Sequence, residues 1–223
     1  GIGGALLSEM TGGADIATLY TKTSQFANCL SSRFLLPTDG QPYFVLATKQ
    51  DEYCFTGKLM LHCDGESALS TKRLMKRYPY YKFPISGVKL ETAGRVDRDV
   101  ELKFFLGEEE FSIDVAKALL DDLVPWYKRL AHLEMQQRSN ASKWERATST
   151  ISAEKRSLFL AQTPDPATMF VSAVDKTFEA TTTQWHACQP KTFDAIFAGG
   201  ISDVDVEIEA VEIEAVAQGG GDD

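Results

Sequence analysis

Hydrophobic and polar positions change their spacing twice along the chain. Apolar residues between Ile16 and Leu30 recur at helical spacing behind Asp15, which can cap a helix, and they predict a helix over about 15–30. After the polar turn at Pro37–Gly40 the period falls to two, which is typical of half-buried strands. The helical period returns beyond Asp114.

The alternating region predicts an antiparallel sheet of short strands. Turn signals at Asp64–Glu66 and Gly107–Glu110 separate the apolar runs, and the polar stretch Gly94–Asp99 fits the exposed loop of a hairpin because Gly94 adopts positive φ without steric cost. The expected strands are Tyr43–Thr48, Tyr53–Cys63, Thr71–Ile85, Val88–Thr92, Val100–Leu106 and Phe111–Ile113.

A helix capped by Asp114 is predicted to follow the strands, with an inward stripe from Val115 to Leu130. Pro125 lacks a backbone N–H, and we expect it to kink or restart this helix. Six or seven antiparallel strands followed by one amphipathic helix predict a small bent sheet or barrel that the helix closes at one end.

Charge divides the chain into two parts. Residues 20–133 carry 16 Lys and Arg against 15 Asp and Glu, whereas residues 161–223 carry 2 against 12. A phosphate-binding surface needs excess Lys and Arg, so we expect no nucleic-acid partner. The longest apolar run is too short to span a bilayer, and the four cysteines are widely spaced without a metal or disulfide pattern. We interpret the protein as soluble, with reduced thiols.

Three stretches carry a family resemblance: TGKLMLHCDGE, KRYPYYKFPISGVKLETAG and DVELKFFLGEEEFSIDVAKALLDDL. Together they resemble the bacterial pleckstrin-homology-like domains over about residues 15–133. The resemblance implies a mainly β (α+β) fold, a seven-stranded antiparallel barrel capped by a C-terminal helix, with an N-terminal helix and an extended C-terminal segment. It also implies relatives that form ring-like homo-oligomers or bind lipid head groups or protein partners.

The domain boundaries follow from this resemblance and from the change in composition. Residues 1–14 form a lead, 15–133 the pleckstrin-homology-like domain, 134–160 a helical connector and 161–223 an acidic, aromatic-bearing C-terminal extension.

One basic segment is a candidate for contact with an anion or a lipid. It interleaves with tyrosines and could meet an anionic membrane surface or an acidic partner, or it could be the solvated face of a strand. The loop Lys49–Glu52 has two acids beside its single base, which departs from the pattern of phosphoinositide-binding domains. The residues of the segment are Lys72, Arg73, Lys76, Arg77 and Lys82.

The extension supplies candidates for docking to a partner. Residues 204–217, VDVEIEAVEIEAVA, place apolar side chains opposite acidic ones whether they form a strand or a helix, and a disordered acidic tail is the third alternative. The docking candidates are Trp185, Phe193, Phe197, Val204, Ile208 and Val211.

Catalytic and metal motifs do not emerge from the sequence. His62 and Cys63 are adjacent, but successive strand residues point to opposite faces, and Asp97, Asp99 and Glu101 fit a solvated turn. We therefore expect no enzyme activity, no metal and no cofactor.

The sequence thus favours a non-catalytic scaffold or accessory subunit that self-associates or docks into a larger assembly, which could be membrane-associated, through its barrel and extension. The alternative is a peripheral binder of anionic membrane lipids. The sequence does not identify the compartment; a soluble intracellular location is expected, which could be an organelle after removal of a targeting segment.

Overall fold

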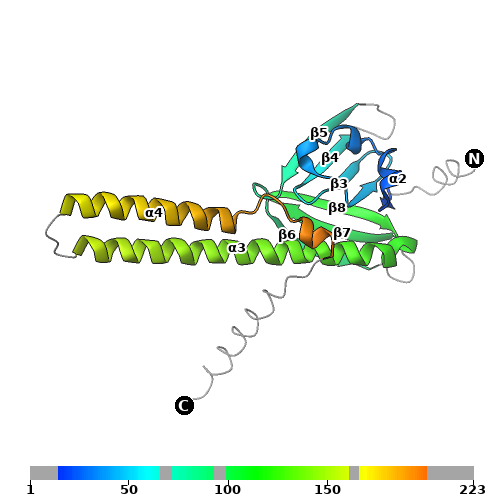
Figure 1. Cartoon of the computed structure of the whole chain (residues 1–223). Helices are drawn as coiled ribbons and strands as arrows, with labels where there is room; N and C mark the ends of the chain where they lie inside the picture. The colour runs from blue at the N-terminus through cyan, green and yellow to red at the C-terminus, as the bar shows by residue number, and fades with distance from the viewer. Residues whose placement is uncertain (1–14, 66–71, 93–98, 161–165, 200–223) are drawn as a thin grey trace, which may run out of the picture.

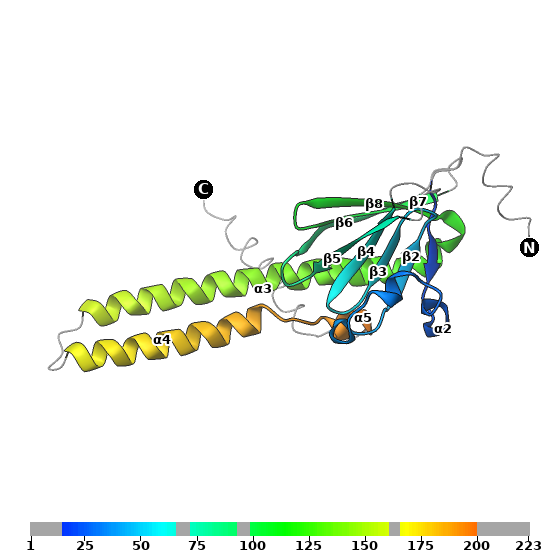
Figure 2. The same ribbon diagram turned by 90° about the horizontal axis from the view of Figure 1, so that it is seen from above.

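The computed structural model describes residues 15–65, 72–92, 99–160 and 166–199. Two antiparallel sheets stack against each other, and a long helix crosses one end and continues far beyond them, where a second helix lies beside it (Figures 1 and 2). The hairpin loop at Gly94–Asp99 lies largely outside the described residues, but the strands on either side of it pair antiparallel, as predicted.

The first sheet has five strands in sequential order, each antiparallel to the next. Strand β4 has the longest run of buried residues, Leu59–Cys63, because both faces of this sheet are covered. The strands are β1 (Thr18–Tyr20), β2 (Phe44–Ala47), β3 (Glu52–Phe55), β4 (Leu59–Gly65) and β5 (Arg73–Pro79).

The second sheet has three strands, β6 (Ile85–Glu91), β7 (Asp99–Leu106) and β8 (Glu109–Ala116). A parallel bridge between Ala17 and Val115 joins the two sheets at one corner. At the other corner β5 and β6 are the outer strands of their sheets and do not pair with each other. The prediction of a closed seven-stranded barrel is therefore wrong, since the described residues form eight strands in two sheets.

The predicted N-terminal helix over 15–30 is also wrong. Residues 18–20 form strand β1, which pairs with β2, and the helix α2 is limited to Thr23–Phe26. Two short 3₁₀ turns follow, η1 (Ser31–Arg33) and η2 (Pro37–Asp39). The apolar residues that suggested this helix are buried in two different places. Leu19 packs in the core between the sheets, and Phe26 packs on the outer face of the first sheet.

Two apolar clusters hold these layers together. The larger lies between the sheets and under the long helix, with Phe44 stacked on Phe55 at 4.2 Å and Phe104 on Phe111 at 5.2 Å between ring centroids. The smaller lies on the outer face of the first sheet, under α2 and the first 3₁₀ turn. It includes three of the four cysteines, and all four are free thiols, as predicted.

The long helix α3 (Leu120–Leu160) begins after a 3₁₀ turn, η3 (Lys117–Leu119), and not at Asp114, which lies in β8. The helix is continuous through Pro125. Pro125 lies beyond the first turn of α3, so its missing N–H leaves the carbonyl of Asp121 without its usual intrahelical partner. Leu123 and Leu130 of the predicted stripe are fully buried.

The region after α3 is helical, whereas the sequence predicted an extended segment. Helix α4 (Pro166–Cys188) returns beside α3, and a short helix α5 (Asp194–Phe197) packs against the sheets (Figure 1). The described part of the C-terminal extension is therefore α4, which forms a helical hairpin arm with α3, and α5, which anchors the arm at its base. None of the described helices is both long and apolar enough to cross a membrane.

Candidate functional site

The five basic candidates do not form one surface. Arg73, Lys76 and Arg77 lie on β5, Lys72 precedes it, and Lys82 lies in the following turn with its Nζ 5.4 Å from the centroid of the Phe83 ring. Because side chains alternate along a strand, Lys76 points to the opposite face from Arg73 and Arg77. The structure therefore splits the predicted basic segment between the two faces of one strand.

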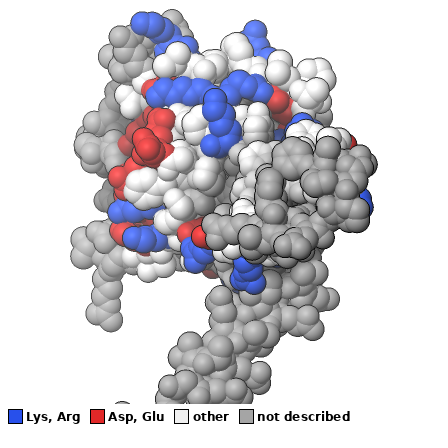
Figure 3. All heavy atoms as spheres, turned by 90° about the vertical axis from the view of Figure 1, so that its left-hand side faces the viewer, with Lys and Arg blue, Asp and Glu red and all other residues white. Residues whose placement is uncertain are grey.

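Acidic side chains lie beside these cations. Arg77 contacts Asp39 at 2.6 Å, and Lys76 contacts Asp64 at 2.9 Å and Glu109 at 3.5 Å. On the face shown in Figure 3, blue and red side chains likewise lie next to one another. Such pairing lowers the positive charge that β5 can offer to a phosphate group.

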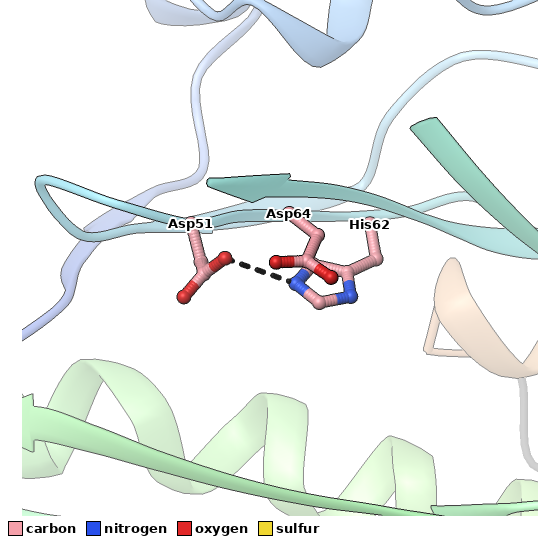
Figure 4. Close-up of side chains that lie close together, drawn as sticks. All are labelled: Asp51, His62 and Asp64. Atoms are coloured by element: carbon pink, nitrogen blue, oxygen red, sulfur yellow. Dashed lines mark hydrogen bonds and ion pairs between the residues drawn. The ribbon is translucent and has the colours of Figure 1, made fainter. Parts of the chain in front are cut away.

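Next to the basic strand, Asp51, His62 and Asp64 come together (Figure 4). His62 and Asp64 lie two residues apart on one face of β4, and Asp51 immediately precedes β3 on the neighbouring strand. The Nε2 atom of His62 lies 3.3 Å from Oδ1 of Asp51, and the backbone N–H of Gly65 donates to the same oxygen at 3.0 Å. Cys63 faces the other apolar cluster, so His62 and Cys63 do point to opposite faces.

Three candidate ligand atoms of this cluster lie within 4.8 Å of one another, a spacing that a metal ion could use after a small contraction. Two features favour an ion-pair network instead. Lys76 already neutralises Asp64. Metal coordination by Nε2 would move the imidazole proton to Nδ1, which is buried without a hydrogen-bond partner among the described residues.

The cluster leads to a prediction about acid stability. Burial lowers the pKa of His62, because desolvation of the ring outweighs the opposing attraction of Asp51. The unfolded chain, with a His pKa of about 6.5, therefore binds the proton more readily, and stability falls as the pH drops below that value. We expect acidification from about pH 7.5 to about pH 5.5 to destabilise the wild type more than His62→Gln, as measured by urea unfolding.

The comparison with His62→Gln isolates one titrating group. The glutamine side chain in this variant keeps an N–H toward Asp51 but does not titrate, so the contributions of Asp64, Lys76 and Tyr53 around it are common to both proteins. Equal loss of stability in wild type and variant would show that His62 does not carry the effect.

Comparison with known proteins identifies the sheets and the start of α3 as a family module. The sequence profile of the bacterial PH (pleckstrin-homology) domain family matches residues 18–133. The chain belongs to this family. A PH domain containing bacterial protein from Exiguobacterium sibiricum 255-15 is similar over 84% of this chain and 100% of its own, at 31% identity and a TM-score of 0.76.

A second relative is the uncharacterised protein YvbH of Bacillus subtilis strain 168, which is 55% identical over 91 residues. That match spans 41% of this chain and 45% of the relative, so the chain covers less than half of that relative's length. PH-like domains often mediate binding to proteins or lipids. The solved structure from Exiguobacterium matches more of the chain than the PH domain alone, so the helical arm is shared in part.

Outside the PH domain, the docking candidates of the extension have different positions. Phe193 and Phe197 are buried in the chain's own core, where Phe197 stacks on Tyr43 at 5.4 Å and on Tyr80 at 6.0 Å. The backbone N–H of Phe193 donates to the carbonyl of Gly57 at 2.6 Å. Both phenylalanines therefore anchor the helical arm to its own PH domain.

Trp185 lies on α4, edge-on to Trp144 of α3 at 5.1 Å, and keeps 45% of its surface exposed. Val204, Ile208 and Val211 lie outside the described residues. The docking candidates did not include three other exposed apolar residues of α4, namely Val171, Val174 and Phe178. The signal was present, because positions 171, 174, 178 and 185 are separated by three, four and seven residues.

Proposed function

We propose that this protein is a non-catalytic scaffold or accessory subunit that self-associates through the helical arm formed by α3 and α4, with its PH domain held at the base. The observation that carries the proposal is the exposed apolar stripe on α4. Phe178 is 72% exposed, and Val171, Val174 and Trp185 are also open to solvent on one side of the helix.

The spacing of these residues fits a helix-to-helix seam. Steps of three and four residues keep side chains on one face of a helix, as at the a and d positions of coiled coils. The inner side of α4 is different, since Ala173, Thr177 and Thr181 share one face of the helix and are partly buried. Small side chains line this side of α4, while Val171, Val174 and Phe178 remain exposed and Trp185 is shared between Trp144 of α3 and solvent.

The position of the arm supports the same function. α3 and α4 extend away from both sheets, so a second arm could lie along the stripe without meeting the PH domain (Figure 2). Burying a side chain as large as Phe178 contributes about 1.5–3 kcal/mol, and a symmetric pair would bury it in both copies. Self-association would bury these apolar side chains, which are exposed on the helix surface of a single chain.

The test is the solution mass of the full chain, measured by light scattering across a dilution series. We expect a discrete oligomer for the wild type. Val174→Glu combined with Phe178→Glu should raise the dissociation constant at least about 100-fold, because each glutamate would bury an unpaired charge in the seam. The matched control is Ser172→Glu with Thr183→Glu, which adds the same charge to exposed positions on the opposite side of α4 and should leave the mass unchanged.

A monomeric wild type at about 100 μM, a concentration well above a micromolar dissociation constant, would contradict self-association. Equal dissociation by the stripe variant and the control variant would place the interface elsewhere.

A further inference from the structure

The open corner between the sheets leaves one strand edge to be explained. On β6, the edge donors are satisfied by α3: Glu134 accepts from the N–H groups of Gly87 and Val88, each at 3.1 Å, and Gln137 accepts from Ile85 at 2.8 Å. β5 is the outermost strand of its own sheet. Within the described residues, the backbone of residues 74–77 has no recorded hydrogen bond other than those with β4.

The side chains along this edge differ by face. Leu74 is 60% exposed although it shares a face with Tyr78, which is buried in the core between the sheets. Lys76 lies between Leu74 and Tyr78 on that face, and Arg73 and Arg77 lie on the other face with Met75 between them. An added strand would fit if it placed apolar side chains opposite Leu74 and Tyr78 and acidic ones opposite the two arginines.

The chain itself contains such a strand sequence. Residues 204–209 read Val-Asp-Val-Glu-Ile-Glu, with apolar and acidic residues in strict alternation. Residues 200–223 contain eight Asp and Glu and no Lys or Arg. The period is that of a strand, and the negative charge of the segment has the opposite sign to the cations of β5, of which Lys76 and Arg77 also contact acids of the domain.

The anchor helix brings this segment to the correct end of the edge. Phe197 stacks on Tyr80, the residue that directly follows β5. Gly199 ends the described chain two residues later, and residues 200–203 can span about 13 Å when extended. A chain leaving this point and running along β5 toward Arg73 is antiparallel to β5.

We propose that residues 204–209 add to the free edge of β5 in the same chain as a sixth, antiparallel strand of the first sheet. The register that matches the two ends of β5 places Val204 opposite Tyr78 and Ile208 opposite Leu74, with Val206 between them opposite Lys76. It also places Asp205 opposite Arg77 and Glu209 opposite Arg73. The inference goes beyond the self-association of the arm, because it requires one chain alone. With this segment in place, strands of other molecules could not pair with the edge of β5.

Amide hydrogen exchange in the full chain, resolved by NMR, tests this pairing. We expect the outward-pointing amides of residues 74–78 to exchange at least about 10-fold faster in Asp205→Lys with Glu209→Lys than in the wild type. Glu214→Lys is the matched control, since the register leaves position 214 beyond the end of β5, and its exchange should match the wild type. The reciprocal exchange of charges, Arg73→Glu with Glu209→Arg, should restore protection that Glu209→Arg alone removes.

A covalent test gives the register. Leu74→Cys with Ile208→Cys should form a disulfide within one chain under mild oxidation, whereas Leu74→Cys with Val211→Cys should not. Equal amide exchange in wild type and charge variants would overturn the proposal. Cross-linking between chains alone, or protection that rises with protein concentration, would also overturn it, because the segment would then belong to another molecule.

Discussion

Replacing Phe197 with alanine is expected to lower the free energy of unfolding by about 3–5 kcal/mol, the usual cost of removing a buried phenylalanine ring. The ring is completely buried and stacks on Tyr43 and Tyr80 at the base of the PH domain. Its loss would leave a cavity among residues that α5, α3 and the first sheet contribute together. Urea unfolding followed by circular dichroism measures the change.

Phe34→Ala provides the matched control for this substitution. Phe34 is 44% exposed and is not part of either core cluster. Its replacement should cost less than about 1 kcal/mol, because water already covers much of the ring. If both variants lost the same stability, α5 would not be docked in the folded protein, and the arm would lose its anchor.

Replacing Glu52 with alanine should destabilise the protein by about 2–3 kcal/mol, because it leaves several donors without an acceptor. The carboxylate accepts from the N–H of Leu30 at 3.0 Å, from the N–H of Ser31 at 2.7 Å and from the Ser31 hydroxyl. These bonds hold the α2 and η1 segment over the outer face of the first sheet. The same urea experiment measures the loss.

Glu52→Gln separates the loss of acceptors from the loss of charge. Glutamine keeps one acceptor oxygen at the same position, so we expect about half the destabilisation of the alanine variant. Glu110→Ala, at an exposed position of β8, should have almost no effect. A loss of stability in Glu110→Ala equal to that in Glu52→Ala would attribute the effect to total charge and not to these three bonds.

Several elements could be predicted from the sequence because their signals are local. β7 was expected at Val100–Leu106 and forms at Asp99–Leu106, where a clean alternation lies between two turn signals. The turn at Thr56–Lys58 was missed, so that β3 and β4 were predicted as one strand. Both strands are buried on both faces, so no change of period marks the turn. Gly57 was the one sign of this turn in the sequence. The structure shows why glycine occupies the position, since a Cβ there would lie 2.0 Å from Asp194.

The candidate sites show the same division. The sequence identified Phe193, Phe197 and Trp185 as residues that pack on something, yet it could not distinguish the chain's own core from a partner. A residue that packs in its own core and one that packs on a partner have the same composition and spacing in the sequence. The two are distinguished by the path of the chain, which α4 brings back to the PH domain before residue 193. For the basic segment, the sequence left contact with an anion and a solvated strand face both open, because the acids that contact Lys76 come from other strands, β4 and β8.

Strand periodicity, the PH-domain motifs of residues 18–133 and the acidic character of the extension were thus determined by the sequence alone, because each depends on residues close together in the chain. The tertiary structure alone decided that the sheets stay open between β5 and β6, that α4 leaves an apolar stripe exposed and that α5 fills the base of the PH domain. The physical reason is that burial is a property of the assembled layers: the same phenylalanine is a core residue at 197 and a surface residue at 178, according to what packs over it.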